Sequence, residues 1–148
     1  GGEGSPIGTI FVLGDMEELA AYLRQLVLNP CKGHRKGIRS IHDSEFFETI
    51  REFAALDGAF LVNEDGVVES AGTYLAVPGE RKTKLAAGLG ARHAAAALIT
   101  SKTAAISVVV SASSGIVTVF HGGKAILELE RPLRHAPATS DASQRTKK

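Results

Sequence analysis

The chain has 148 residues, 44% of them hydrophobic and 22% charged, and a formal net charge of +1. This length suits one domain with an ordinary core, and the balanced charge gives no general attraction to nucleic acid or to an anionic membrane. The single cysteine excludes an internal disulfide framework, no apolar run reaches the length of a membrane span, and the N-terminal residues lack the pattern of a secretory signal. We therefore expect one globular domain in a reducing, cytoplasmic setting, with no membrane partner and no nucleic acid bound by this domain.

The N-terminal part of the chain predicts a strand followed by two helices. Residues 8–14 form a short apolar run bounded by glycines, which is typical of a buried strand. Asp15 then begins a helix, because its spacing to Glu18 is that of a capping box and leucines recur at helical spacing until Pro30. Residues 43–55 predict a second, amphipathic helix. The apolar faces of the two helices consist of Leu19, Leu23, Leu26, Phe46, Phe47, Ile50, Phe53 and Ala54.

The rest of the chain predicts six strands and one helix. Residues 58–72 read as two strands around Asp65 and Gly66, a dipeptide that suits a tight hairpin turn, and residues 72–77 read as a third strand. An alanine-rich helix follows. After it, three β-branched runs separated by short polar turns predict a meander over residues 104–130.

The order of these elements, β-α-α-β-β-β-α-β-β-β, implies an α/β (α+β) domain with a central mixed sheet flanked by helices. We place this single domain at residues 1–130. Residues 131–148 lose hydrophobicity and periodicity together, so we expect them to form a disordered tail.

A basic segment lies between the first two predicted helices. A solvated basic connector is the favoured interpretation, and a phosphate-binding loop is the alternative. Cys31 and His34 have a spacing that occurs in zinc sites, but no second pair follows at a suitable distance, so we exclude zinc here. The basic residues of the segment are Lys32, His34, Arg35, Lys36 and Arg39.

Asp57 is the first candidate for chemistry. It lies where the second predicted helix gives way to a strand, and Gly58 and Ala59 after it leave little side-chain bulk. A carboxylate there can hold a hard cation or accept a proton from a hydroxyl, while small neighbours let a ligand approach the backbone. The plainer alternative is a simple turn, which an Asp-Gly dipeptide also favours.

The second candidate is the start of the alanine-rich helix, where Gly88 and Gly90 precede Arg92 and His93. The first N–H groups of a helix lack partners within it and attract anions, glycines let an anion come close, and an arginine adds a forked, permanent charge. Phosphate binding explains this pattern. A structural role, in which the glycines pack tightly and Arg92 pairs with a surface acid, explains it equally.

Several motifs in a fixed order resemble the diadenylate cyclase (DAC) family, which makes cyclic di-AMP. The segments are DGAF (57–60), SAGTYL (70–75), GLGARHAAA (88–96), VVVSASSG (108–115) and FHGGKA (120–125). The family carries an Asp-Gly-Ala motif, an Arg-His motif that opens a helix, and a strand that ends in Ser-Glu-Glu-x-Gly. The resemblance extends from about Asp43 to Glu130, and three motifs in register make it specific.

The resemblance implies that two such domains face each other as a homodimer or within a higher homo-oligomer, each holding one ATP. Each 3′-hydroxyl attacks the other α-phosphate, giving cyclic di-AMP and two pyrophosphates, and positioning and charge supply the catalysis. Asp57 would bind Mg²⁺ or Mn²⁺ and help deprotonate the hydroxyl, and Arg92 and His93 would act on the phosphates. The implied nucleotide-binding residues are Gly58, Ala59, Gly72, Thr73, Tyr74, Leu75, Gly90, Ala91, Ser111 and Ser113, with Tyr74 and Leu75 near the adenine.

Two motifs depart from the family pattern. Ala94 stands where a second arginine is common, and Ala112 and Ser113 stand where the two glutamates are expected. Candidates for the missing groups elsewhere in the chain are Lys84 and the segment 32–39 for the cation, and Glu64, Asp65 and Glu69 for the acid. The alternative function is therefore a catalytically weakened module that binds ATP or cyclic di-AMP, and a third is a domain that serves protein contacts alone.

Overall fold

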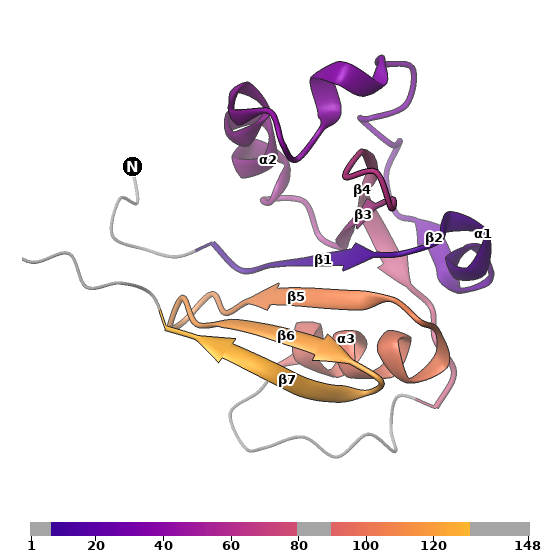
Figure 1. Cartoon of the computed structure of the whole chain (residues 1–148), viewed down its shortest axis with the longest axis vertical. Helices are drawn as coiled ribbons and strands as arrows, with labels where there is room; N and C mark the ends of the chain where they lie inside the picture. Colours follow the sequence, from indigo (N-terminus) through magenta and orange to yellow (C-terminus); the bar gives the residue numbers. More distant parts are fainter. Residues whose placement is uncertain (1–6, 80–89, 131–148) are drawn as a thin grey trace, which may run out of the picture.

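The computed structural model describes residues 7–79 and 90–130 and contains a seven-stranded mixed sheet in the order β2-β4-β3-β1-β5-β6-β7 (Figure 1). The strands are β1 (Thr9–Leu13), β2 (Leu23–Gln25), β3 (Ala59–Val62), β4 (Val68–Leu75), β5 (Ile106–Val110), β6 (Val117–His121) and β7 (Lys124–Leu129). The α-helices are α1 (Met16–Leu19), α2 (Phe47–Phe53) and α3 (Ala91–Lys102), and the 3₁₀ helices are η1 (Ala20–Tyr22), η2 (Lys36–Arg39) and η3 (Ser44–Phe46).

Strand β1 lies in the middle of the sheet and joins its two halves. It pairs in parallel with β3 and antiparallel with β5, while β2–β4, β3–β4, β5–β6 and β6–β7 are all antiparallel. The prediction of an α+β domain with a central mixed sheet is confirmed, and so is the meander β5–β6–β7.

The two faces of the sheet are covered by different helices. Helix α3 packs on β5, β6 and β1, and Ala96 and Ile99 join the cluster that contains Ala59 and Leu61. Phe60 belongs to the cluster on the opposite face, which is covered by η3 and α2. Ala59 and Leu61 lie on one face and Phe60 on the other because successive residues of a strand point to opposite faces. Figure 1 shows α3 against the β5–β7 meander, with α2 in the lobe around β3 and β4.

The long helix predicted from Asp15 to Pro30 is wrong beyond its first turns. Helix α1 ends at Leu19 after a start at which the Asp15 carboxylate accepts a hydrogen bond from the N–H of Glu17. Residues 23–25 instead form edge strand β2 on β4, where the Gln25 side chain donates to the carbonyl of Ala71. Tertiary pairing with β4 therefore overrides the helical spacing of the leucines, a common outcome for a short segment of moderate propensity.

The third strand predicted at residues 72–77 is not separate. Residues 72–75 continue β4, whose pairing with β3 changes register between Ala59 and Val62, so the strand passes through Gly72 without ending. Helix α2 and η3 occupy the predicted 43–55 helix, but Phe47 is 53% exposed and does not belong to its buried face.

Among the described residues, no helix has the length and apolar character needed to cross a membrane. The first six residues and the expected tail at 131–148 lie outside the described residues.

Candidate nucleotide site

Three chain segments meet where the central strands of the sheet end, and this row of strand ends is one edge of the sheet. They are the residues before β1, before β3 and after β5. Phe11 on β1 pairs with Phe60 on β3, and Thr9 on β1 pairs with Val110 on β5. Because β1 runs parallel to β3 and antiparallel to β5, the residues before β1, before β3 and after β5 meet at the same edge. Asp57 and the loop 111–113 are therefore neighbours although they lie far apart in the sequence.

A cavity of about 470 Å³ opens at this edge. Its volume lies within the range of about 300–1,000 Å³ that is usual for small-molecule sites. The start of α3 closes it from the side of the β5–β7 meander. The lining residues are Asp57, Gly58, Gly90, Ala91, Arg92, His93, Val110, Ser111, Ala112 and Ser113.

The N-terminus of α3 supplies anion-binding groups to the cavity. Gly90 is the N-cap residue and offers no side-chain cap, and a Cβ built on it would meet no atom within 4 Å. Within the described residues no side chain caps this 12-residue helix, so its first N–H groups are available at the cavity together with the positive end of the helix dipole. This end of α3 can bind a phosphate group through backbone N–H groups.

Arg92 is held close to the other two segments. A Cβ built on Gly8 would lie 2.8 Å from Nη1 of Arg92 and 2.8 Å from Cβ of Ala112. The absence of a side chain at Gly8 thus leaves the space that the guanidinium group occupies. Sequence reasoning missed Gly8, because only the β1–β5 register brings it beside Arg92.

His93 lies at the inner wall of the cavity and is 7% exposed. Its ring packs edge-on against Phe120, with 6.2 Å between the ring centroids. Burial and, second, the Arg92 charge lower the pKa of His93, and Glu128 opposes them in part. The neutral imidazole is favoured, so it can donate one hydrogen bond without adding a charge.

Gly58 lines the cavity beside Asp57, and its backbone contacts β4 directly. Its φ is +104°, and an added Cβ would lie 2.7 Å from the carbonyl carbon of Gly72 and from the nitrogen of Thr73. Only glycine fits this conformation and this close contact between two strands. The exposed Asp57 carboxylate consequently projects from a fixed turn.

The loop after β5 contributes hydroxyl groups. The Ser111 and Ser113 Oγ atoms lie 3.1 Å apart, and Ser111 Oγ also accepts from the N–H groups of Ser113 and Ser114, at 3.3 Å each. No cluster of three or more potential metal-ligating His, Cys, Asp or Glu side chains occurs within residues 7–79 and 90–130. Asp57 is the one carboxylate among the lining residues that the structure describes.

Eight of the thirteen site residues expected from the sequence line this cavity, and five lie behind or beside it. Ala59 is buried in the core, and Thr73 is buried with its hydroxyl bonded to the Gln25 amide. Tyr74 is 38% exposed, and the Arg24 guanidinium lies 5.1 Å from the centre of its ring. The five residues that do not line the cavity are Ala59, Gly72, Thr73, Tyr74 and Leu75.

The suggested replacements for the missing groups do not lie at the cavity. Glu64 and Asp65 follow β3 and therefore lie at its opposite end from Asp57, and Glu69 is paired with Arg39 at 2.7 Å. The basic segment 32–39 contributes no lining residue. Lys84 lies outside the described residues.

Comparison with known proteins identifies relatives over most of the chain. A family described as "DisA bacterial checkpoint controller nucleotide-binding" matches residues 2–125. A protein named diadenylate cyclase from Methanocaldococcus jannaschii is 45% identical over 130 residues, which make up 88% of this chain and 40% of that protein. A protein of the same name from Haloferax volcanii is 38% identical over 130 residues, 88% of this chain and 47% of that protein. The chain thus spans less than half the length of these relatives.

Solved structures share the fold. A hypothetical membrane spanning protein from Bacillus cereus superimposes with a TM-score of 0.60 and 26% identity, over 86% of this chain and 56% of that one. A double mutant of DacA from Staphylococcus aureus gives a TM-score of 0.56 and 22% identity, over 80% of this chain and 73% of that one. At such identities the likeness supports the fold.

Proposed function

Because the chain belongs to the DAC family of nucleotide-binding domains, we propose that it is the catalytic domain of a diadenylate cyclase, which joins two ATP molecules into cyclic di-AMP and releases two pyrophosphates. The observation that carries the proposal is that one cavity is lined by both the Asp57 carboxylate and the Arg92 end of α3. Both curated relatives bear the name diadenylate cyclase, which favours a cyclase over a binding module.

The triphosphate binds at the N-terminus of α3. Backbone N–H groups after Gly90 donate to phosphate oxygens, and Arg92 supplies the permanent positive charge. His93 donates from a neutral ring, which suits an oxygen that gains charge as the pyrophosphate leaves. Ser111 and Ser113 face the same anion from the loop after β5 and can exchange their mutual hydrogen bond for bonds to phosphate.

Asp57 acts on the incoming 3′-hydroxyl. Its exposed carboxylate accepts the hydroxyl hydrogen bond and orients the oxygen for attack on the α-phosphorus. The same carboxylate fits Mg²⁺ or Mn²⁺, because such ions are commonly held by one or two carboxylates and complete their shell with phosphate oxygens and water. Bound there, the metal would supply charge that stabilises the transferring phosphoryl group.

The adenine lies toward β4. Gly72 and Thr73 contact Gly58 from the far side of the cavity floor, and Tyr74 follows them along the strand. The partly exposed ring of Tyr74 offers a flat apolar surface for a base, whereas Leu75, the next residue of β4, points to the opposite face and packs on the core beneath α3. The Arg24 guanidinium, on the neighbouring strand, packs on the Tyr74 ring at 5.1 Å from its centre.

Turnover requires two copies of the chain. One cavity presents one triphosphate site, so the attacking hydroxyl has to come from a nucleotide on a second protomer. At each of the two reaction centres an O–P bond forms to the α-phosphorus, the bond to the β-phosphate oxygen breaks, and the hydroxyl proton leaves to base or water. The active species is accordingly a face-to-face homodimer or a larger homo-oligomer.

The test is incubation of the chain with ATP and Mn²⁺, with cyclic di-AMP and pyrophosphate followed by chromatography. Asp57→Asn and Arg92→Gln should each lower the rate by about 100-fold or more, in line with the loss of one charge-stabilising group. Arg51→Gln, which removes an exposed arginine of α2, is the matched control and should leave the rate unchanged. Equal rates for all four proteins would refute the site.

Ala112→Glu separates a cyclase from a weakened module. This substitution restores an acid to the loop that faces Asp57, and we expect it to raise the rate in Mn²⁺. Cyclic di-AMP from the unaltered chain supports the cyclase. If ATP raises the melting temperature but neither protein forms product, the domain is a binding module.

A further inference from the structure

The basic segment 32–39 has no part in the nucleotide cavity, yet it borders a second cavity. This second cavity has a volume of about 240 Å³ and lies between the chain around residues 30–39 and helix α2. None of its lining residues lines the nucleotide site. It therefore has to be explained separately from the proposed reaction.

The walls of the second cavity are largely apolar. Phe46 and Phe53 come from η3 and α2, and Ile38 lies at the mouth with 42% of its surface exposed. Cys31 is buried, and burial raises the pKa of its thiol, so it presents an uncharged wall. An apolar cavity of about 150 Å³ already accommodates benzene. The available space thus takes an aromatic ring with a short chain.

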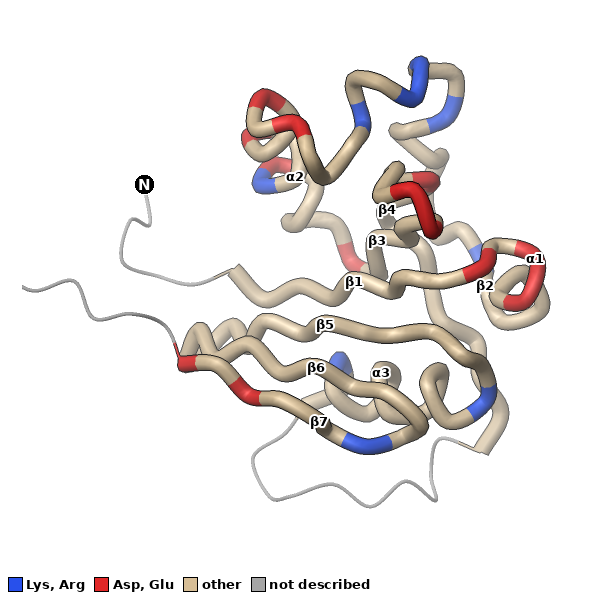
Figure 2. The backbone as a smooth tube through the Cα atoms, viewed as in Figure 1, with Lys and Arg blue, Asp and Glu red and all other residues tan. Residues whose placement is uncertain are grey.

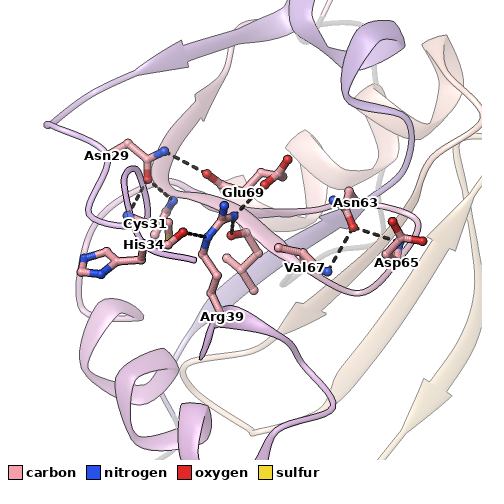
Figure 3. Close-up of polar contacts among 10 residues, drawn as sticks. Asn29, Cys31, His34, Arg39, Asn63, Asp65, Val67 and Glu69 are labelled. Atoms are coloured by element: carbon pink, nitrogen blue, oxygen red, sulfur yellow. Dashed lines mark hydrogen bonds and ion pairs between the residues drawn. The ribbon is translucent and has the colours of Figure 1, made fainter. Parts of the chain in front are cut away.

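One polar side chain in the cavity is firmly positioned. Arg39 donates from Nε to the carbonyl of His34 at 2.8 Å, and from Nη1 to the carbonyl of Val68 at 2.8 Å and to the Glu69 carboxylate at 2.7 Å (Figure 3). These contacts use Nε and Nη1. Among the described residues no acceptor is bonded to Nη2, so its N–H groups can donate to a ligand. A guanidinium held in this way binds an acceptor with little further loss of side-chain entropy.

The charge around the mouth favours an anion. Glu69 balances Arg39, but the exposed residues Lys32, Arg35 and Lys36 add positive charge beside the lining residues. Figure 2 shows several Lys and Arg positions, in blue, along the loop above β4. A carboxylate at Arg39 would lie within this positive region.

We propose that the cavity between residues 30–39 and α2 is a second ligand site, which takes a small apolar molecule carrying one carboxylate. The apolar part fills the space between Phe46 and Phe53. The carboxylate accepts hydrogen bonds from Nη2 of Arg39. The site needs no nucleotide, so its test is independent of the cyclase proposal.

The experiment titrates 3-phenylpropionate and its neutral analogue 3-phenylpropan-1-ol into the nucleotide-free chain, with binding mapped by NMR. We expect a dissociation constant on the order of 1 mM for the carboxylate, given its few heavy atoms, and about tenfold weaker binding of the alcohol. Shift changes should concentrate at Ile38 and Thr49. Changes concentrated at Gly90 and Ala91 would place the ligand in the nucleotide cavity and overturn the proposal.

Substitutions then test the contacts. Thr49→Phe fills the cavity from α2 and should abolish binding of both compounds. The double variant Arg39→Gln/Glu69→Gln removes both members of the ion pair, so neither charge is left without its partner, and the two compounds should then bind equally. Arg51→Gln, on α2 outside the cavity, should change neither affinity by more than twofold.

Each contrary result is decisive. Equal binding of acid and alcohol by the unaltered chain rejects the carboxylate, and unchanged binding by Thr49→Phe rejects the cavity. Because Cys31 is the single cysteine of the chain, its modification by methyl methanethiosulfonate is an independent measure of access to the site. The carboxylate should slow that reaction in the unaltered chain, and failure to slow it also counts against the proposal.

Discussion

Replacing Gly58 by alanine tests whether the turn that presents Asp57 depends on glycine for two separate reasons. The first is the backbone conformation, with φ at +104°, which L-residues with a side chain rarely adopt. The second is space, because the new Cβ would lie 2.7 Å from the carbonyl carbon of Gly72 and 2.9 Å from the carbonyl oxygen of Thr73. Both neighbours are backbone atoms and cannot rotate away.

The expected loss of unfolding free energy is the sum of these two effects. The positive φ costs about 1–2 kcal/mol for a residue with a Cβ. Relief of the overlap requires β4 to move by about 0.7 Å to reach ordinary contact at 3.4 Å, and such overpacking costs about 1–3 kcal/mol. Gly58→Ala should therefore lose about 2–5 kcal/mol, a large part of the stability of a typical domain.

Gly33→Ala is the matched control. Gly33 has a similar φ of +91°, but a Cβ built on it meets no atom within 4 Å. This substitution should lose only the conformational part, about 1–2 kcal/mol. The chain lacks tryptophan, so urea unfolding is best followed by circular dichroism. Equal losses for the two variants would refute the close contact between Gly58 and β4.

Three further predictions concern the nucleotide cavity. Gly8→Ala should weaken ADP binding about tenfold, because the new Cβ would displace the Arg92 guanidinium, and calorimetric titration measures the change. Gly90→Ala should change the unfolding free energy by less than about 1 kcal/mol, since its Cβ meets only open space, yet weaken ADP binding by crowding the phosphate. The lowered pKa of His93 means that above about pH 6.5 the folded and unfolded states both hold it neutral, whereas below that pH the unfolded state binds the proton more readily. Unfolding free energy should thus fall with decreasing pH by at most about 1.4 kcal/mol per pH unit from this group, and urea titrations of His93→Gln should lack that contribution.

Elements with a clear period were predictable from the sequence. The β5–β7 meander and α3 have long, consistent patterns bounded by glycine turns, and the structure confirms them. The segment at Leu23 was not predictable, because leucines at a spacing of three or four residues favour a helix while pairing with Leu75 on β4 favours a strand. The spacing of the leucines can be read from the sequence, whereas the pairing of Leu23 with β4 cannot.

Site residues with a reactive or charged side chain were predictable from the sequence. Residues that reach the site only through strand register were not. Asp57, Arg92 and His93 carry functional groups at the ends of elements, and all three line the cavity. Gly8 carries none, and its place beside Arg92 follows from the pairing of Thr9 with Val110. The family motif indicated Tyr74, which does not line the cavity. A motif does not show which face of a strand a cavity borders.

The position of β1 explains how the two halves of the site are brought together. The Asp57 carboxylate lies just before β3, whereas Arg92 comes from α3 and the serine hydroxyls from the loop after β5, so the two halves of the site belong to different parts of the chain. Only β1 pairs with both β3 and β5, so its register fixes Asp57 relative to Arg92. A slip of one residue would exchange Ile10 and Val12 with Phe11 and Leu13 between the two apolar clusters, and the resulting misfit of packing on both faces holds the register in place. The hydrophobic core therefore sets the geometry of a polar site to which it contributes no functional group.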